Sequence, residues 1–162
     1  MQDKAEFEAY FRQDYSLLIR FVMNLGAQRC TAEDVVMNTL LEALQNWDVI
    51  EHPRAWVRKV ATRKYLKAID HDIHRFDTLE DAPLVLATLD VAEHFAQRDL
   101  VQAALQRLPD KQRIVMAWTI DGYPPKCIAE ELEFSADSVR KILQRARENL
   151  KSFLGRDDDW EA

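Results

Sequence analysis

Glycine occurs only three times in the 162 residues and proline five times, and this scarcity restricts the possible fold more than any other feature. A β-sandwich or β-barrel reverses its chain many times and uses glycine and proline at those turns. Alanine, leucine, glutamine, glutamate and arginine are plentiful instead, and all of them favour helix. We therefore expect an all-α protein.

Charge divides the chain into parts. The net charge of −6 argues against a protein that coats nucleic acid by bulk electrostatics. The excess acid lies in 77–98, with five acidic and one basic side chain, and in 156–162, with four and one. Neither segment has a sustained apolar period. We interpret them as a linker and a solvated tail, and expect two small helical domains, 1–76 and 99–155.

Apolar spacing predicts three helices in the first domain. The first ends at Gly26, and the second covers roughly 32–47. Thr31 and Asp34 resemble a capping box at the start of this second helix. The third helix covers 53–69, with a proline in its first turn.

The third helix carries a positive stripe. Between its ends lie six cations in fourteen residues without a single acid, and such a stripe suits a phosphate backbone. Tyr65 lies among the cations as a possible base-stacking platform. Trp56 shares a face with Val60 and is assigned to the core, and we expect Val57 and Ala61 to face inward with them. A solvated helix face explains the stripe equally well. Its cations are Arg54, Arg58, Lys59, Arg63, Lys64 and Lys67.

The second domain ends in the pattern of a helix-turn-helix. Asp90 with Glu93 looks like a helix start, and a further helix begins at Pro109. A short helix then follows two prolines, and after a break Ser135 is a good N-cap for a long helix. A short helix, a tight break and a longer capped helix are typical of a helix-turn-helix.

The long helix has side chains suited to reading DNA. With its apolar residues turned inward, it exposes cations and one glutamine. Arginine and lysine bind guanine edges and phosphates, and glutamine reads adenine. An ordinary solvated surface helix is the alternative. The DNA-reading candidates are Arg140, Lys141, Gln144 and Arg145.

Catalytic and targeting signals are lacking. There is no HExxH motif, no nucleophile elbow and no phosphate-cradling loop, so we expect neither an enzyme nor a cofactor or metal site. Cys30 and Cys127 belong to no CxxC or Cys/His cluster and are expected to be reduced packing residues. With no signal peptide and no apolar run long enough to span a membrane, we expect a cytoplasmic protein.

At several places the residues resemble the sigma factors of bacterial RNA polymerase, of the two-domain extracytoplasmic-function type. Residues 32–43 are similar to the family's AEDLVQETFLRA segment, and 53–61 to its (F/P)RAWLxxIA segment. Residues 108–113 resemble LPxxQR, 121–132 resemble EGxSxxEIAExL, and 138–147 resemble TVKSRLHRAR. These stretches follow the family's order and lie between residues 32 and 147.

The resemblance implies roles for particular residues. The second helix docks on the polymerase clamp, which maps to Asp34, Met37, Asn38 and Leu41. The third helix and its loop open and hold the minus-ten promoter element, which maps to Arg58, Lys59, Arg63, Lys64 and Lys67. The last helix reads the minus-thirty-five element through the DNA-reading candidates. Core RNA polymerase and promoter DNA are the implied partners, and an anti-sigma factor is a further one.

The chain also departs from the family pattern. The family's Gln-Glu is Met37-Asn38 here, the usual IARN run ends at Arg63, the turn glycine is Glu133, and one recognition-helix arginine is Ile142. A second hypothesis is therefore a sigma-like interaction module that binds polymerase or an anti-sigma factor without promoter specificity. A third is a helix-turn-helix repressor.

Overall fold

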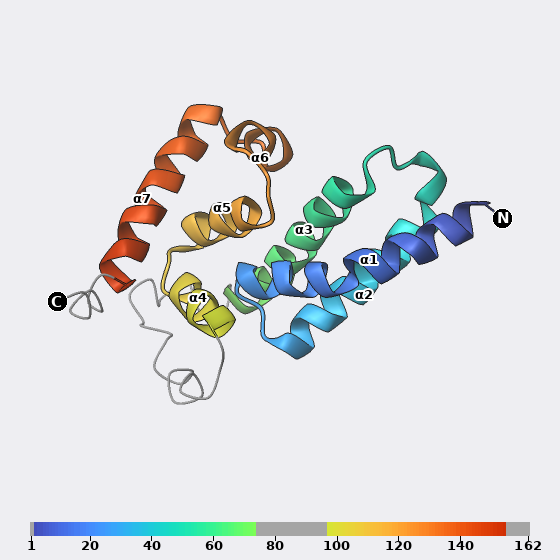
Figure 1. Cartoon of the computed structure of the whole chain (residues 1–162), viewed down its shortest axis with the longest axis horizontal. Helices are drawn as coiled ribbons and strands as arrows, with labels where there is room; N and C mark the ends of the chain where they lie inside the picture. Colours follow the sequence, from blue (N-terminus) through green and yellow to red (C-terminus); the bar gives the residue numbers. More distant parts are fainter. Residues whose placement is uncertain (1, 74–96, 155–162) are drawn as a thin grey trace. The chain divides into compact units, whose positions relative to one another are not determined.

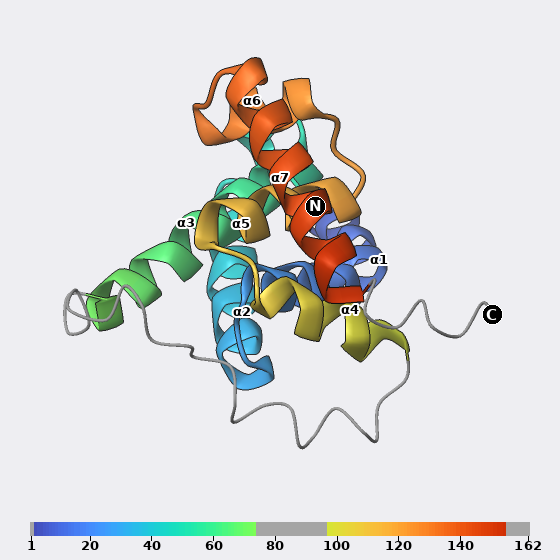
Figure 2. The same cartoon turned by 90° about the vertical axis from the view of Figure 1, so that its left-hand side faces the viewer.

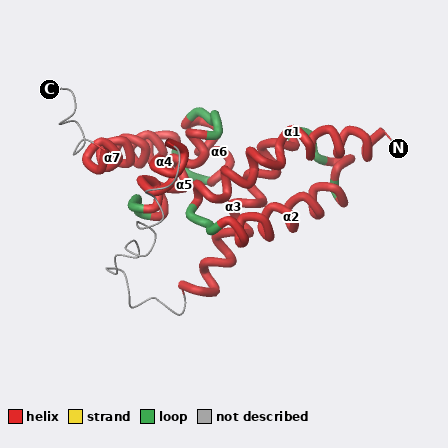
Figure 3. Tube along the Cα trace, turned by 60° about the horizontal axis from the view of Figure 1, so that its bottom comes forward, coloured by secondary structure: helices red, strands yellow, loops and turns green. Residues whose placement is uncertain are grey.

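The computed structural model describes residues 2–73 and 97–154, and all regular structure in these two ranges is helical (Figure 1). The prediction of an all-α protein is confirmed. The expected helix start at Asp90 and Glu93, nearly all of the expected linker and the acidic tail lie outside the described residues. Figure 3 shows that short loops join the described helices within each range.

Two compact units make up the chain. The first holds Met1–Met23 and Ala27–Glu80, and the second holds Asn24–Gly26 and Asp81–Ala162. Helices α1 to α3 belong to the first unit apart from the last residues of α1, and α4 to α7 belong to the second.

The first unit has three long helices and one short turn of helix. They are α1 (Gln2–Leu25), α2 (Arg29–Gln45), the 3-10 helix η1 (Trp47–Val49) and α3 (Pro53–Ile73). Gly26 follows α1 with a φ of 124°, a left-handed conformation that glycine adopts without strain, as expected of a helix stop.

The expected capping box does not start α2. The helix begins one turn earlier, with Gln28 at the N-cap and no side-chain cap. The carbonyl of Gln28 accepts the first helical hydrogen bond from the amide of Ala32 at 2.8 Å. Arg29 pairs with Glu33 at 3.1 Å across this first turn, and such a pair supports the additional turn.

The first unit buries the apolar side of each helix. Leu18, Phe21 and Val22 of α1 are almost completely enclosed, as are Val36 of α2 and Val57 of α3. Helices α2 and α3 pack closely along their lengths. Cys30 is exposed rather than packed, because it lies in the first turn of α2 away from this core.

The second unit contains α4 (Gln97–Gln106), α5 (Asp110–Ile120), α6 (Pro125–Leu132) and α7 (Ala136–Leu154). Prolines precede or open two of these helices. Pro109 is the N-cap of α5, and Pro124 is the N-cap of α6 with another proline directly after it. A proline suits these positions because the amide that it lacks would have no helical partner there.

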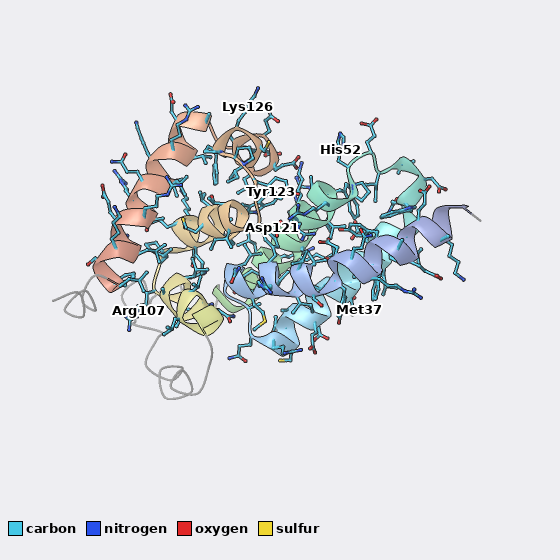
Figure 4. All side chains as sticks on the ribbon, viewed as in Figure 1. Met37, His52, Arg107, Asp121, Tyr123 and Lys126 are labelled. Carbon is cyan, nitrogen blue, oxygen red and sulfur yellow. The ribbon has the colours of Figure 1, made fainter. Side chains whose placement is uncertain are left out.

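Helix α7 is held against the rest of its unit by its apolar side. It packs on α5 and α6, as Figure 1 and Figure 2 both show, and Val139, Leu143 and Ala146 are buried there. In its C-terminal half, Asn149 donates a hydrogen bond to Gln112 of α5 at 2.7 Å. The guanidinium of Arg107, labelled in Figure 4, lies 5.6 Å from the ring centre of Phe153. These contacts fix the orientation of the helix.

No helix within the described ranges is both long and apolar enough to cross a membrane.

Candidate nucleic-acid and protein interfaces

The N-terminal half of α7 presents the four DNA-reading candidates together. Ser135 caps the helix as predicted, because its Oγ accepts a hydrogen bond from the amide of Ser138 at 3.1 Å. The inward side of the helix is fixed by its buried residues, so the opposite side faces solvent. On that side Arg140, Lys141, Gln144 and Arg145 are all exposed.

Two contacts within the helix touch these side chains. Arg140 lies 3.3 Å from Asp137, and Gln144 donates to Glu148 at 3.4 Å. Both contacts are exposed, and exposed pairs of this kind contribute little free energy. A phosphate or a base edge could therefore replace them at small cost.

The turn that precedes α7 has a left-handed residue. Glu133 follows α6 with φ 58° and ψ 37°, and the amide of Phe134 donates back to the carbonyl of Ala129 at 3.0 Å. This is the usual geometry of a glycine that ends a helix. The family's turn glycine thus has a geometric reason, and the glutamate adopts the same conformation despite its Cβ.

The cations of α3 do not form one exposed face. Arg63 and Lys67 are exposed, Lys59 and Lys64 are half-buried, and Lys64 Nζ lies 2.9 Å from a carboxylate oxygen of Glu42 on α2. Arg58 is completely buried. A contact between Arg58 and DNA, as the resemblance implied, is therefore excluded in this structure.

The reason is a rotation of the inward face. Of the four residues predicted to face inward, Val57 and Ala61 are buried, whereas Trp56 and Val60 are only half-buried. Arg58, Thr62 and Tyr65 are buried beside Val57 and Ala61, which places the inward face about one residue further round the helix. Arg58 falls inside that arc. Tyr65 is buried too, so it offers no exposed stacking platform.

Arg58 has a partner on α1 that the sequence reading missed. Its Nη2 donates to Oδ1 of Asp14 at 2.7 Å, and its Nη1 donates to the other carboxylate oxygen. Tyr10 donates its hydroxyl to the same carboxylate. The available signal was the position of Asp14, four residues before Leu18, on the apolar side of a predicted amphipathic helix.

An exposed row lies along α2. Asp34, Met37, Asn38 and Leu41 share the side opposite the buried one, and all four are exposed. Met37, labelled in Figure 4, is 44% exposed and Leu41 is 53% exposed. Leu44, also 44% exposed, extends the row by one turn. An apolar row bordered by polar side chains is typical of the centre of a protein interface.

Metal-binding geometry is lacking in the part of the chain that the structure describes. Nowhere in that part do three or more His, Cys, Asp or Glu side chains gather as ligands of an ion would.

Comparisons with known proteins identify part of the chain directly. Residues 98–150, which contain nearly all of α4 to α7, match the family described as Sigma-70, region 4. No curated protein sequence matches the chain.

Two solved structures have the same fold. One is CnrH in complex with the cytosolic domain of CnrY, at a TM-score of 0.67 and 23% identity over 95% of this chain and 90% of that one. The other is the sigma factor RpoE in complex with the anti-sigma factor NepR from Bartonella quintana. Its TM-score is 0.72, with 20% identity over 93% of this chain and 97% of that one.

The chain thus shares its fold with a sigma factor, and its residues 98–150 are similar to sigma-70 region 4. These findings support the resemblance to sigma factors that the sequence indicates.

Proposed function

We propose that the protein is a sigma factor that binds core RNA polymerase and directs promoter-specific initiation of transcription. Helix α2 would dock on the polymerase through Asp34, Met37, Asn38 and Leu41. Helix α7 would read the minus-thirty-five element. Helix α3, with the loop that precedes it, would engage the minus-ten element through Lys59, Arg63, Lys64 and Lys67.

The match of 98–150 to sigma-70 region 4 carries this proposal. That range contains nearly all of the helix-turn-helix, and the long helix exposes side chains able to contact both bases and phosphates. The exposed apolar row on α2 supports the polymerase-binding role.

Sigma factors regulate transcription without catalysing a reaction, so we assign no enzymatic activity and no cofactor. We place the protein in the cytoplasm, where the polymerase is. The two similar structures were solved with the cytosolic domain of CnrY and with the anti-sigma factor NepR. We therefore include an anti-sigma factor among the proposed partners.

A sigma-like interaction module is the second candidate, and the charges of α3 favour it. Of the five cations assigned to minus-ten DNA, Arg58 is buried against Asp14, and Lys64 is paired with Glu42. Both pairs reduce the positive charge available to phosphates. A helix-turn-helix repressor gives no account of the first unit, although the fold match covers both units.

Run-off transcription separates these candidates. Purified core polymerase and the full chain are offered a library with randomised minus-ten and minus-thirty-five elements, and the selected promoter is then used with variants. We expect Arg145→Ala to lower transcription from it about tenfold, because one base or phosphate contact contributes roughly 1–3 kcal/mol. Core binding should not change.

Lys151→Ala is the matched control, since Lys151 is an exposed cation of α7 roughly 9 Å further along the helix than Arg145. If the parent transcribes all library members equally, the sigma-factor proposal is wrong. The interaction module then remains.

A further inference from the structure

The buried ion pair between Asp14 and Arg58 begins a series of contacts through the first unit. Arg58 is fully buried, and its guanidinium also lies 5.8 Å from the ring centre of Phe21. Both guanidinium Nη atoms donate to Asp14, so the pair is bidentate and fixes the two helices in one relative geometry. Burial of two charges is costly unless the geometry is good, so such a pair is more a specifier of geometry than a source of stability.

The contacts continue along α1 to the next loop. Tyr10 lies one turn before Asp14 and donates its hydroxyl to the Asp14 carboxylate. The Tyr10 ring lies 5.3 Å from the ring of Trp47, and Phe7 meets the same indole edge-on at 5.2 Å. An unbroken path therefore runs from Arg58 on α3, through α1, to the first residue of η1.

Trp47 anchors the loop between α2 and α3. That loop spans 46–52 and starts at Asn46, whose side-chain amide donates to the carbonyl of Glu42 at 2.9 Å. Trp47 turns toward α1 and is half-buried, whereas Val49 is 77% exposed. His52 is exposed as well, and Figure 4 shows it pointing away from the helices. The loop thus presents its own side chains to solvent while one indole holds it to α1.

We propose that Arg58, Asp14 and Tyr10 are positioning residues that hold loop 46–52 in the conformation needed to engage minus-ten DNA. None of the three would touch DNA. They act through Trp47, so that the loop and the exposed cations of α3 keep a fixed relative geometry. This inference rests on the proposed sigma-factor function.

Tyr10 is only half-buried, so substitutions at this position test the proposal with little loss of stability. Tyr10→Leu removes both the hydroxyl bond to Asp14 and the ring contact with Trp47. Tyr10→Phe keeps the ring and removes only the hydroxyl. Tyr15→Phe is the matched control, because it removes a hydroxyl of the same helix that does not bond Asp14 and keeps the ring that stacks on Phe11 at 5.0 Å.

The measured quantity is the ratio of open-complex formation on the selected promoter to that on a promoter with one changed minus-ten base. Opening is followed by 2-aminopurine fluorescence with full chain and core polymerase. A purely structural defect lowers both rates equally and leaves the ratio unchanged. We expect Tyr10→Leu to lower the ratio about fivefold or more, since a mispositioned base contact loses its discrimination. Tyr10→Phe should lower it less, and Tyr15→Phe should not change it.

Three results would overturn the inference. One is an unchanged ratio in both Tyr10 variants, and another is an equal fall in Tyr15→Phe. In both cases the proposed sigma-factor function is unaffected as long as the unmodified protein distinguishes the two promoters. The third is a parent that does not distinguish the two promoters, which rejects the proposed function together with the inference. Asp14→Asn provides a second variant, and its ratio should fall as in Tyr10→Leu in the fraction that remains folded by circular dichroism.

Discussion

Replacement of Arg58 by methionine should destabilise the first unit strongly. Methionine is unbranched and apolar and replaces the aliphatic stem of Arg58, but it leaves the carboxylate of Asp14, which is only 5% exposed, without its cation. Loss of one partner of a buried pair costs about 3–5 kcal/mol. A domain of this size loses about 4–8 °C in Tm per kcal/mol, so we expect Tm to fall by roughly 12–40 °C.

The matched double variant should recover most of that loss. Asp14→Leu combined with Arg58→Met removes both charges and leaves an apolar contact. Such replacements are often neutral or stabilising, so we expect the double variant to lie within about 1–2 kcal/mol of the parent. Asp14→Leu alone should be as damaging as Arg58→Met, because it leaves the guanidinium buried without its anion.

Urea unfolding followed by circular dichroism measures the free energies, and hydrogen exchange of the amides in α1 and α3 assigns the change to the first unit. Lys67→Met is the control, since Lys67 is an exposed cation of the same helix and should change stability by no more than about 0.5 kcal/mol. If Arg58→Met costs no more than Lys67→Met, the conclusion that Arg58 is a buried structural cation is wrong.

Two further predictions concern single positions. Glu133→Gly should stabilise the second unit by about 1 kcal/mol in thermal unfolding, because glycine has no penalty in the left-handed conformation. The control is Glu130→Gly, on the exposed side of α6, which should destabilise the unit by a similar amount. Glu42→Gln frees Lys64 from its acidic partner, so the slope of log binding constant against log salt concentration for DNA should steepen by about one unit. An unchanged slope would show that Lys64 does not reach phosphate.

Helix positions could be predicted well from the sequence where turn residues mark the ends. Gly26, Pro109 and Ser135 act locally, through backbone conformation or capping, so their effects do not depend on distant partners. The predicted start of α2 was wrong because Thr31 and Asp34 offer a cap, yet no helix breaker lies between Gln28 and Thr31, so the helix extends back to Arg29.

The inward face of α3 could not be predicted in the same way. Val57 and Ala61 were predicted correctly, but the cations recur on every side of the helix, so charge does not mark the exposed side, and Trp56 and Val60 drew the apolar centre away from Arg58. Only a partner more than forty residues away, Asp14, explains why Arg58 is buried. Contacts of that kind depend on how helices pack, which a single sequence does not specify.

The exposed row of Met37, Leu41 and Leu44 has a consequence for how partners share this protein. Two proteins that each cover the row cannot bind at once, because they need the same few side chains. Each one stabilises the bound chain in proportion to the logarithm of its own concentration relative to its Kd. Competition for the exposed row therefore means that the concentration and affinity of each partner alone determine the fraction of the protein bound to it. No conformational signal between the two units is needed.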